Sequence, residues 1–112
     1  MTRNEELLRT AIGGKLPVYT VYQGQKRWLC PHVLGYKGSI LHVLAYQFAG
    51  ESSSKTIVTP PIPEDGPTGN WRCLEVSAMI DLAVQQPGPW YTCKRHTMRQ
   101  SCVDRVVVEV AD

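Results

Sequence analysis

Cysteine and histidine residues near the end of the chain have the types, and part of the spacing, that a metal site requires. Cys93, His96 and Cys102 follow one another closely, and thiolate and imidazole are the ligands that zinc prefers. A structural zinc site has four ligands, however, and Cys30 and His32 could complete the set only if the tail folds back over them. Buried or reduced thiols are the alternative, and we expect no metal and no cofactor.

The pattern of a catalytic centre is missing from the sequence. Ser52, Ser53 and Ser54 lack the flanking glycines of a nucleophile elbow and are typical of a flexible linker. The adjacent carboxylates Glu64 and Asp65 lie in a proline-rich stretch, where they most simply carry solvated charge. The sequence also has no phosphate-binding Gly-rich loop and no dinucleotide fingerprint. We therefore expect no enzymatic activity.

Length and composition agree with a binding module. The chain has 112 residues, of which 43% are hydrophobic and 20% charged, as in a single small globular domain spanning 1–112. A chain of this size buries about two-thirds of its unfolded surface, which favours a shallow groove over a deep catalytic cleft. It has no apolar run long enough for a membrane span, and its acidic start is unlike a secretory signal. We expect a cytoplasmic protein whose four scattered cysteines are reduced.

Charge is distributed unevenly along the chain, although the net charge is only +2. Bases predominate in 15–55 and in 94–99, whereas acids predominate in 64–81 and 104–112. Such a distribution permits an anionic partner if the basic stretches meet in space.

The first residues predict a short amphipathic helix, roughly from Asn4 to Ile12. Thr2 and Glu5 have the spacing of a capping box, apolar residues then share one helical face, and two glycines follow as a stop signal.

Residues with period-two alternation follow and predict strands. The segments 18–22 and 26–30 flank a polar turn and indicate a hairpin. Pro31 is expected at an edge or a bend, because proline donates no hydrogen bond to a ladder. The strand continues over 32–36. The next strand, 39–47, is apolar on both faces and is therefore expected to be central.

The second half of the chain is less regular. Serines, prolines and glycines predict a long loop over 48–70, and 71–76 alternates like a strand. The segment 79–84 fits either a strand or one helical turn, 85–102 is expected to be irregular, and 103–110 predicts a last strand. One helix and five or six antiparallel strands indicate a mainly β fold, either a small barrel or a strongly bent sheet.

Several of these features, in this order, resemble a known family, the WYL domain, an Sm-like (SH3-type) antiparallel β-barrel found mostly in bacterial regulators. The matching features are Tyr22, Gly24, Arg27, Pro31 to Leu34, Ile40 to Tyr46 and Trp71 to Val76. The resemblance covers a core of about 7–84 and leaves 85–112 as an irregular C-terminal extension with the final strand. The family's naming positions fall at Leu41-His42-Val43, so Trp and Tyr are both replaced, and the second arginine usually found after the late strand falls near Ala78.

WYL domains are ligand-sensing modules of transcription factors and defence systems, and several bind single-stranded nucleic acid. The resemblance implies a ligand-binding patch, to which we add Tyr46 because it shares a strand face with His42. The expected site residues are Tyr22, Arg27, His32, His42, Tyr46 and Arg72.

The chemistry of this patch would be recognition without reaction. Arg27 and Arg72 can bind phosphate bidentately, and Tyr22 and Tyr46 can stack on bases. The alternatives are solvated arginines, core aromatics and, at His32 and His42, histidines bonded to the backbone.

The sequence thus predicts a regulatory module whose partner is a small nucleotide-like anion or a short single-stranded nucleic acid. The alternative is a protein-interaction module that pairs a strand edge with a protein partner or with a second copy of itself in a homodimer.

Overall fold

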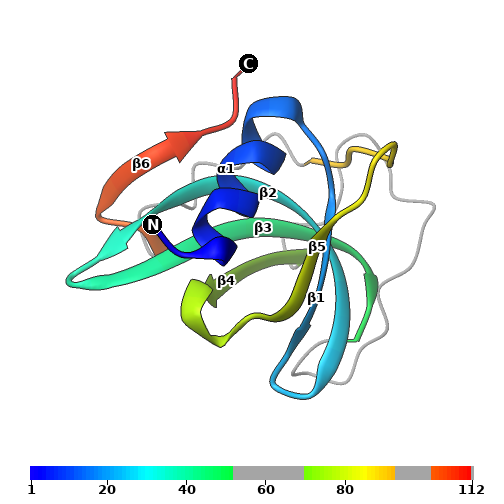
Figure 1. Ribbon diagram of the computed structural model, residues 1–112, viewed down its shortest axis with the longest axis horizontal. Coiled ribbons are helices and arrows are strands. Elements are labelled where there is room, and N and C mark those ends of the chain that lie inside the picture. Colours follow the sequence, from blue (N-terminus) through cyan, green and yellow to red (C-terminus); the bar gives the residue numbers. More distant parts are fainter. Residues whose placement is uncertain (52–69, 93–101, 112) are drawn as a thin grey trace.

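The computed structural model describes residues 1–51, 70–92 and 102–111. One helix precedes six strands and one 3-10 turn in the described part (Figure 1). In chain order these are α1 (Arg3–Gly14), β1 (Val18–Tyr22), β2 (Gln25–Lys37), β3 (Ile40–Gly50), β4 (Trp71–Glu75), η2 (Val76–Ala78), β5 (Ile80–Val84) and β6 (Arg105–Glu109). The prediction of a mainly β fold with an N-terminal helix is confirmed.

All six strands join one antiparallel sheet in the order β4-β3-β2-β1-β5, and β6 pairs with β2 as well. The first part of the long strand β2 pairs with β1 and its last part pairs with β6, so these two strands share one edge of β2. Strands β4 and β5, at the two ends of this order, form no ladder with each other among the described residues. The sheet is therefore open and not a closed barrel.

The N-terminal helix begins as the sequence predicts and ends later. The hydroxyl of Thr2 accepts a hydrogen bond from the backbone N–H of Glu5 at 3.2 Å. The expected end at Ile12 is wrong by two residues, because the stop is made by Lys15, which has φ 53 and whose N–H bonds back to the last turn.

Pro31 lies at a bend of β2, as predicted. The pairing of β2 with β1 ends at Leu29, and its pairing with β6 begins at Val33. The register against β3 shifts between Pro31 and Val33. Proline thus stands where neither β1 nor β6 pairs with β2, and its missing N–H breaks no bond to either strand.

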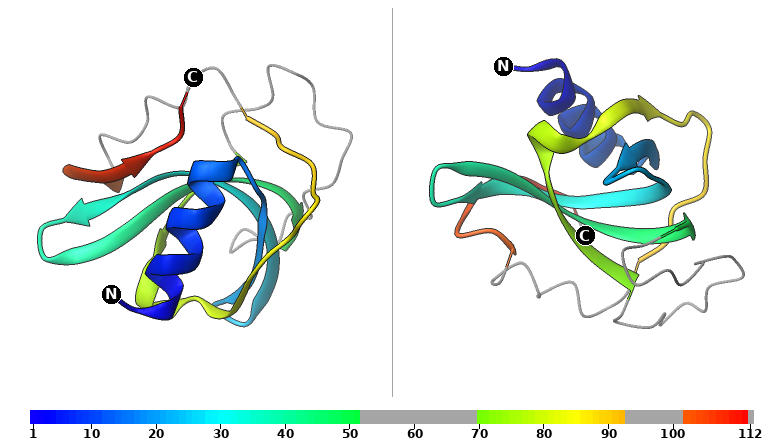
Figure 2. Two further views of the ribbon diagram at one scale, coloured as in Figure 1. Left: turned by 45° about the horizontal axis from the view of Figure 1, so that its top comes forward. Right: turned by 90° about the horizontal axis from the view of Figure 1, so that it is seen from below.

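The strand β3 is central and buries both of its faces. It pairs with β2 on one side and with β4 on the other. One face contributes Val43 and Ala45 to a first core cluster, which α1 covers (Figure 2). The opposite face contributes Leu44 and Tyr46 to a second core cluster. The apolar residues on both faces predicted a central strand, and this prediction is confirmed.

The first core cluster fills the space between α1 and the sheet. Its buried members are Leu8, Ala11, Ile12, Val18, Leu29, Leu34, Val43, Ala45, Leu74, Val76, Met79 and Leu82. The second cluster lies on the other side of the sheet, and its buried members are Cys30, Val33, Leu44, Tyr46, Phe48, Trp71, Cys102 and Val103.

The later strands agree with the predictions except at their ends. Of the two alternatives for 79–84, the strand is correct, as β5. The expected loop over 48–70 begins too early, because β3 extends to Gly50 to pair with β2. Residues 52–69 lie outside the described part. No helix of the described part is both long and apolar enough to cross a membrane.

Candidate functional site

The six residues expected to form one patch lie on two faces of the sheet. Tyr22 packs against the first core cluster, and the Arg27 guanidinium carbon lies 5.2 Å from the centroid of its ring. Arg72 is on the same face, since it alternates along β4 with Trp71, which is in the second cluster.

The other three residues belong to the opposite face. Tyr46 is a buried member of the second cluster, and the Trp71 ring in that cluster contacts His32. His42 shares the face of Tyr46, as the parity of the strand predicts. A single patch that uses all six side chains is therefore not formed, and Tyr22, Arg27 and Arg72 are the subset that the fold brings together.

Arg27 is buried despite its charge, with only 2% of its surface exposed. Its Nη2 donates to Oε1 of Gln25 at 2.8 Å. Its Nε is buried and has no hydrogen-bond partner among the described residues. A buried donor on a charged group is costly to leave unpaired, so this N–H is a position where a ligand acceptor would be stabilising.

Close backbone packing helps to enclose this arginine. Gly50 pairs with Arg27 across the β2–β3 ladder and has φ +94. A Cβ on Gly50 would clash with the carbonyl oxygen of Lys26, so only glycine permits this approach. The register of β2 against β3 also shifts close to this contact, between Trp28 and Leu29.

Arg72 is held by a buried amide that the sequence did not single out. Its Nε donates to Oε1 of Gln47 at 3.0 Å, and its Nη1 donates to the carbonyl of Trp71 at 3.1 Å. Gln47 is fully buried, and its Nε2 donates to the carbonyls of Ala49 and Glu51 at 3.1 and 2.7 Å. These two bonds fix the amide so that its oxygen faces the arginine. The sequence contained one signal for Gln47: it is a polar residue at a position of the central strand where the other residues on the same face are apolar.

The positive charge of Arg27 acts on the guanidinium of Arg72. Burial lowers the pKa of Arg27, and burial followed by the positive charge of Arg27 lowers the pKa of Arg72. Arginine nevertheless remains protonated near neutral pH. Two cations in a partly desolvated site repel each other, and an anion between them would offset both the desolvation and the repulsion.

The hydroxyl of Tyr22 has a structural partner as well. It accepts a hydrogen bond from the backbone N–H of Glu75 at 3.0 Å, which connects the end of β1 to the end of β4. Tyr22 thus supports Arg27 with its ring and closes part of the gap between non-adjacent strands with its hydroxyl.

His32 is a core histidine whose two ring nitrogens are both bonded. Its Nδ1 lies 2.7 Å from the carbonyl oxygen of Cys30, and its Nε2 lies 2.8 Å from the hydroxyl of Thr92. The ring stacks on Trp90 with centroids 4.8 Å apart and meets the edge of Trp71. His32 thus has the structural role of a histidine bonded to the backbone, with Thr92 as a second partner.

Tyr46 and His42 also have structural surroundings. Tyr46 is fully buried and makes an edge contact with Trp71 at 5.1 Å between centroids. A nucleotide base could stack on it only by displacing the second core cluster. His42 is half-buried, and its Nδ1 donates to the carbonyl of Cys102 at 3.0 Å.

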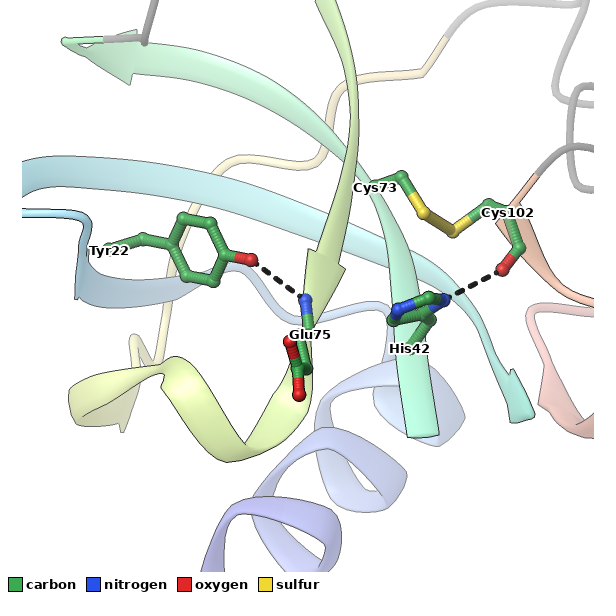
Figure 3. The surroundings of a disulfide bond; sticks show 5 residues. All are labelled: Tyr22, His42, Cys73, Glu75 and Cys102. Carbon is green, nitrogen blue, oxygen red and sulfur yellow. Dashed lines mark hydrogen bonds between the residues drawn. A yellow bond between two sulfur atoms is a disulfide. The ribbon is translucent and has the colours of Figure 1, made fainter. Parts of the chain in front are cut away.

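The expectation that all the cysteines are reduced is wrong for two of them. Cys73 and Cys102 form a disulfide across a sequence separation of 29, with their Cα atoms 5.6 Å apart (Figure 3). The segment that precedes β6 packs against β3 and β4, where His42 also contacts Cys102, and cysteine spacing alone does not show this proximity. Cys30 is a free, buried thiol whose pKa burial raises to about 12. Cys93 and His96 lie outside the described residues.

Comparisons with known proteins add no relative from which a function could be transferred. No protein-family model matches the chain, and neither curated proteins nor solved structures show a significant match.

Proposed function

We propose that this chain is a non-catalytic binding module that holds a small anion, or a phosphate of a short single-stranded nucleic acid, between Arg27 and Arg72. The observation that carries the proposal is the buried guanidinium of Arg27, which keeps one unpaired N–H beside a second guanidinium. Structures rarely bury a charged donor without a partner. A ligand oxygen would supply that partner.

The chemistry of guanidinium favours a phosphate or carboxylate ligand. The planar guanidinium of an arginine can donate two parallel N–H bonds to the oxygens of one phosphate or carboxylate. The ammonium of a lysine cannot make this bidentate contact. The fixed amide of Gln47 orients Arg72 in advance, so less side-chain freedom is lost on binding.

A small anion is favoured over recognition of bases. Tyr46 and His32 are buried in the second core cluster, on the face opposite the arginines. The remaining aromatic residue, Tyr22, already has Arg27 against its ring. The site would therefore recognise the phosphate of a nucleotide-like ligand more strongly than its base.

We further propose that the open sheet is a variant of the Sm-like barrel of WYL domains, in which ligand binding regulates a partner in the cytoplasm. The leading helix, the order of the strands and the bend at Pro31 support this relation.

The test compares three arginine variants in two binding assays. Inorganic phosphate binding is measured by calorimetry, and binding of a labelled single-stranded oligonucleotide by fluorescence polarisation at two salt concentrations. Arg27→Met and Arg72→Met should each weaken binding by about tenfold or more and reduce the salt dependence of oligonucleotide binding. Arg105→Met is the matched control, because the Arg105 guanidinium lies 4.7 Å from the ring centroid of Tyr36, away from the site.

The two assays separate the possible ligands. Phosphate binding with no added affinity for the oligonucleotide would identify a small-anion site, whereas tighter oligonucleotide binding would identify the nucleic acid. Equal affinities of all three variants for both probes would overturn the proposal.

A protein-interaction role is a second candidate, favoured by exposed apolar side chains on two strands. Ile80 on β5 is 58% exposed and Val106 on β6 is 43% exposed, and within the described residues each strand pairs on one side only. Such edges can accept a strand from a partner protein or a second copy. Sedimentation velocity over a range of concentrations tests for self-association, which Ile80→Lys should abolish.

A further inference from the structure

A second group of chemically active side chains lies on the sheet face opposite the arginines. A ring nitrogen of His42 and the sulfur atoms of Cys73 and Cys102 all lie within 4.8 Å of one another. They come from β3, β4 and the residues just before β6, and Figure 3 shows them converging at the disulfide. Imidazole and thiolate are the ligands that zinc prefers.

The backbone holds these three residues together independently of the disulfide. In the β3–β4 ladder His42 pairs with Glu75, and Leu44 pairs with Cys73. His42 and Cys73 therefore point to the same face of adjacent strands. Cys102 is tied to the group by its carbonyl, which accepts the hydrogen bond from Nδ1 of His42 at 3.0 Å. Breaking the sulfur–sulfur bond would leave both connections in place.

The hydrogen bond of His42 also fits a metal ligand. Because a carbonyl can only accept, Nδ1 carries the ring proton, and in the neutral imidazole the lone pair is on Nε2. Histidines that bind a metal through one nitrogen commonly donate the other ring N–H to a backbone carbonyl, which fixes the ring. Coordination through Nε2 would retain this bond to Cys102, and coordination through Nδ1 would replace it.

We propose that, when the disulfide is reduced, Cys73, Cys102 and His42 together bind one zinc ion. Reduction by a dithiol breaks the Cys73–Cys102 bond, transfers two electrons and two protons to the two sulfurs, and converts the dithiol to its own disulfide. Zinc then replaces the two thiol protons, which are released to solvent. Oxidised protein has no thiolate at this position and does not bind the ion. Binding of zinc is thereby coupled to the redox state.

The size of the group is compatible with this coordination. Zn–S bonds of about 2.3 Å and Zn–N bonds of about 2.0–2.1 Å place tetrahedral ligand atoms about 3.5–3.8 Å apart. The observed limit of 4.8 Å requires only side-chain adjustment. Three protein ligands leave the fourth position for water, as in open zinc sites, and Cys73 is exposed to solvent.

The experiment measures metal binding by the full chain in both redox states. One sample is reduced with dithiothreitol, which is removed by gel filtration under anaerobic conditions, and the other is left oxidised. Cobalt(II) is the spectroscopic probe, because thiolate ligands give a charge-transfer band and tetrahedral geometry gives intense visible bands. Zinc content is measured after a second gel filtration. We expect one zinc per reduced chain, release of two protons per zinc, and no zinc on the oxidised chain.

Variants assign the ligands. Cys73→Ser should reduce the charge-transfer band to about half, because one of two thiolates is lost, and His42→Gln should weaken zinc binding at least tenfold with the band retained. Cys102 is buried, so its replacement risks the fold, whereas Cys73 is exposed and provides the safer test. Circular dichroism checks that each variant is folded.

Two matched controls exclude the remaining cysteines. Cys30→Ala removes a buried thiol outside the group, and Cys93→Ser with His96→Ala removes the ligand types of the tail. Both should bind zinc like the reduced parent chain. Absence of zinc from the reduced chain, or loss of binding only in the Cys93→Ser and His96→Ala variant, would overturn the proposal. The result is independent of anion binding, because Arg27 and Arg72 are unchanged.

Discussion

The hydroxyl of Tyr22 accepts the backbone N–H of Glu75 at 3.0 Å and so joins β1 to β4, two strands that form no ladder with each other in the described part of the chain. The same residue, Glu75, pairs with His42 on β3. One tyrosine therefore connects the face that carries the arginines to the strand that carries Cys73. Its hydroxyl and its ring have separable roles, and each can be tested.

Tyr22→Phe should lower the free energy of unfolding by about 1–2 kcal/mol, because the N–H of Glu75 loses its acceptor while the ring remains against Arg27. Urea denaturation followed by circular dichroism measures the change. Tyr36→Phe is the control, since its ring also lies beside an arginine, Arg105, and its hydroxyl loss should cost less. Equal effects of the two substitutions would show that the Glu75 bond contributes nothing.

Arg27→Met should leave stability unchanged or increase it by up to about 2 kcal/mol, although it weakens anion binding. The substitution removes a buried charge with an unpaired N–H, and apolar replacements of buried charges are often neutral or stabilising. Thermal unfolding with and without inorganic phosphate measures both effects. The parent chain should gain stability from phosphate, and the variant should gain little. A loss of several kcal/mol without ligand would mean that the arginine is a structural element.

Reduction of the Cys73–Cys102 disulfide should lower the free energy of unfolding by about 2–4 kcal/mol. The bond closes a loop with a sequence separation of 29, and its removal returns conformational entropy to the unfolded chain. Urea denaturation with and without dithiothreitol, in the presence of a chelator, measures the metal-free difference. Cys73→Ser should show the reduced stability without dithiothreitol and no further response to it. Zinc added to the reduced parent chain should restore part of the loss, through binding to the folded state.

The buried thiol of Cys30 should make stability fall at alkaline pH. Its pKa is raised to about 12 in the folded chain, against about 8.5 for an exposed thiol. The folded state therefore retains the proton more tightly, and this contribution is present below about pH 8.5 and is lost as pH rises toward the folded value. Between pH 8 and pH 10 the parent chain should lose about 2 kcal/mol more than Cys30→Ala.

Alkylation provides an independent check on Cys30. The thiolate is the reactive form, so iodoacetamide should modify Cys30 much more slowly in the folded chain than in urea. Mass spectrometry of proteolytic fragments distinguishes it from Cys93. Rapid modification of Cys30 under native conditions, or equal pH dependence of the parent and Cys30→Ala, would contradict a buried, protonated thiol.

Local sequence patterns were sufficient for most of the elements. The Thr2 cap, the alternation in β1 and β2, the bend at Pro31 and the apolar faces of β3 each depend on residues near one another in the chain. The ends of the elements were harder to predict, because the helix continues to Gly14 before Lys15 ends it, and pairing with β2 extends β3 to Gly50.

The candidate sites could not be predicted from local patterns, because they are formed by contacts between residues that are far apart in the sequence. Side-chain alternation and capping act over a few residues, and they were sufficient to predict a mainly β chain with an N-terminal helix and a central strand buried on both faces. Only the tertiary structure divided the six expected site residues between two faces, buried Arg27 near Arg72, and placed His42 beside Cys73 and Cys102. The physical reason is that strand register and the docking of the segment before β6 are set by packing of the whole chain, and a shift of one residue would reverse which face each side chain occupies.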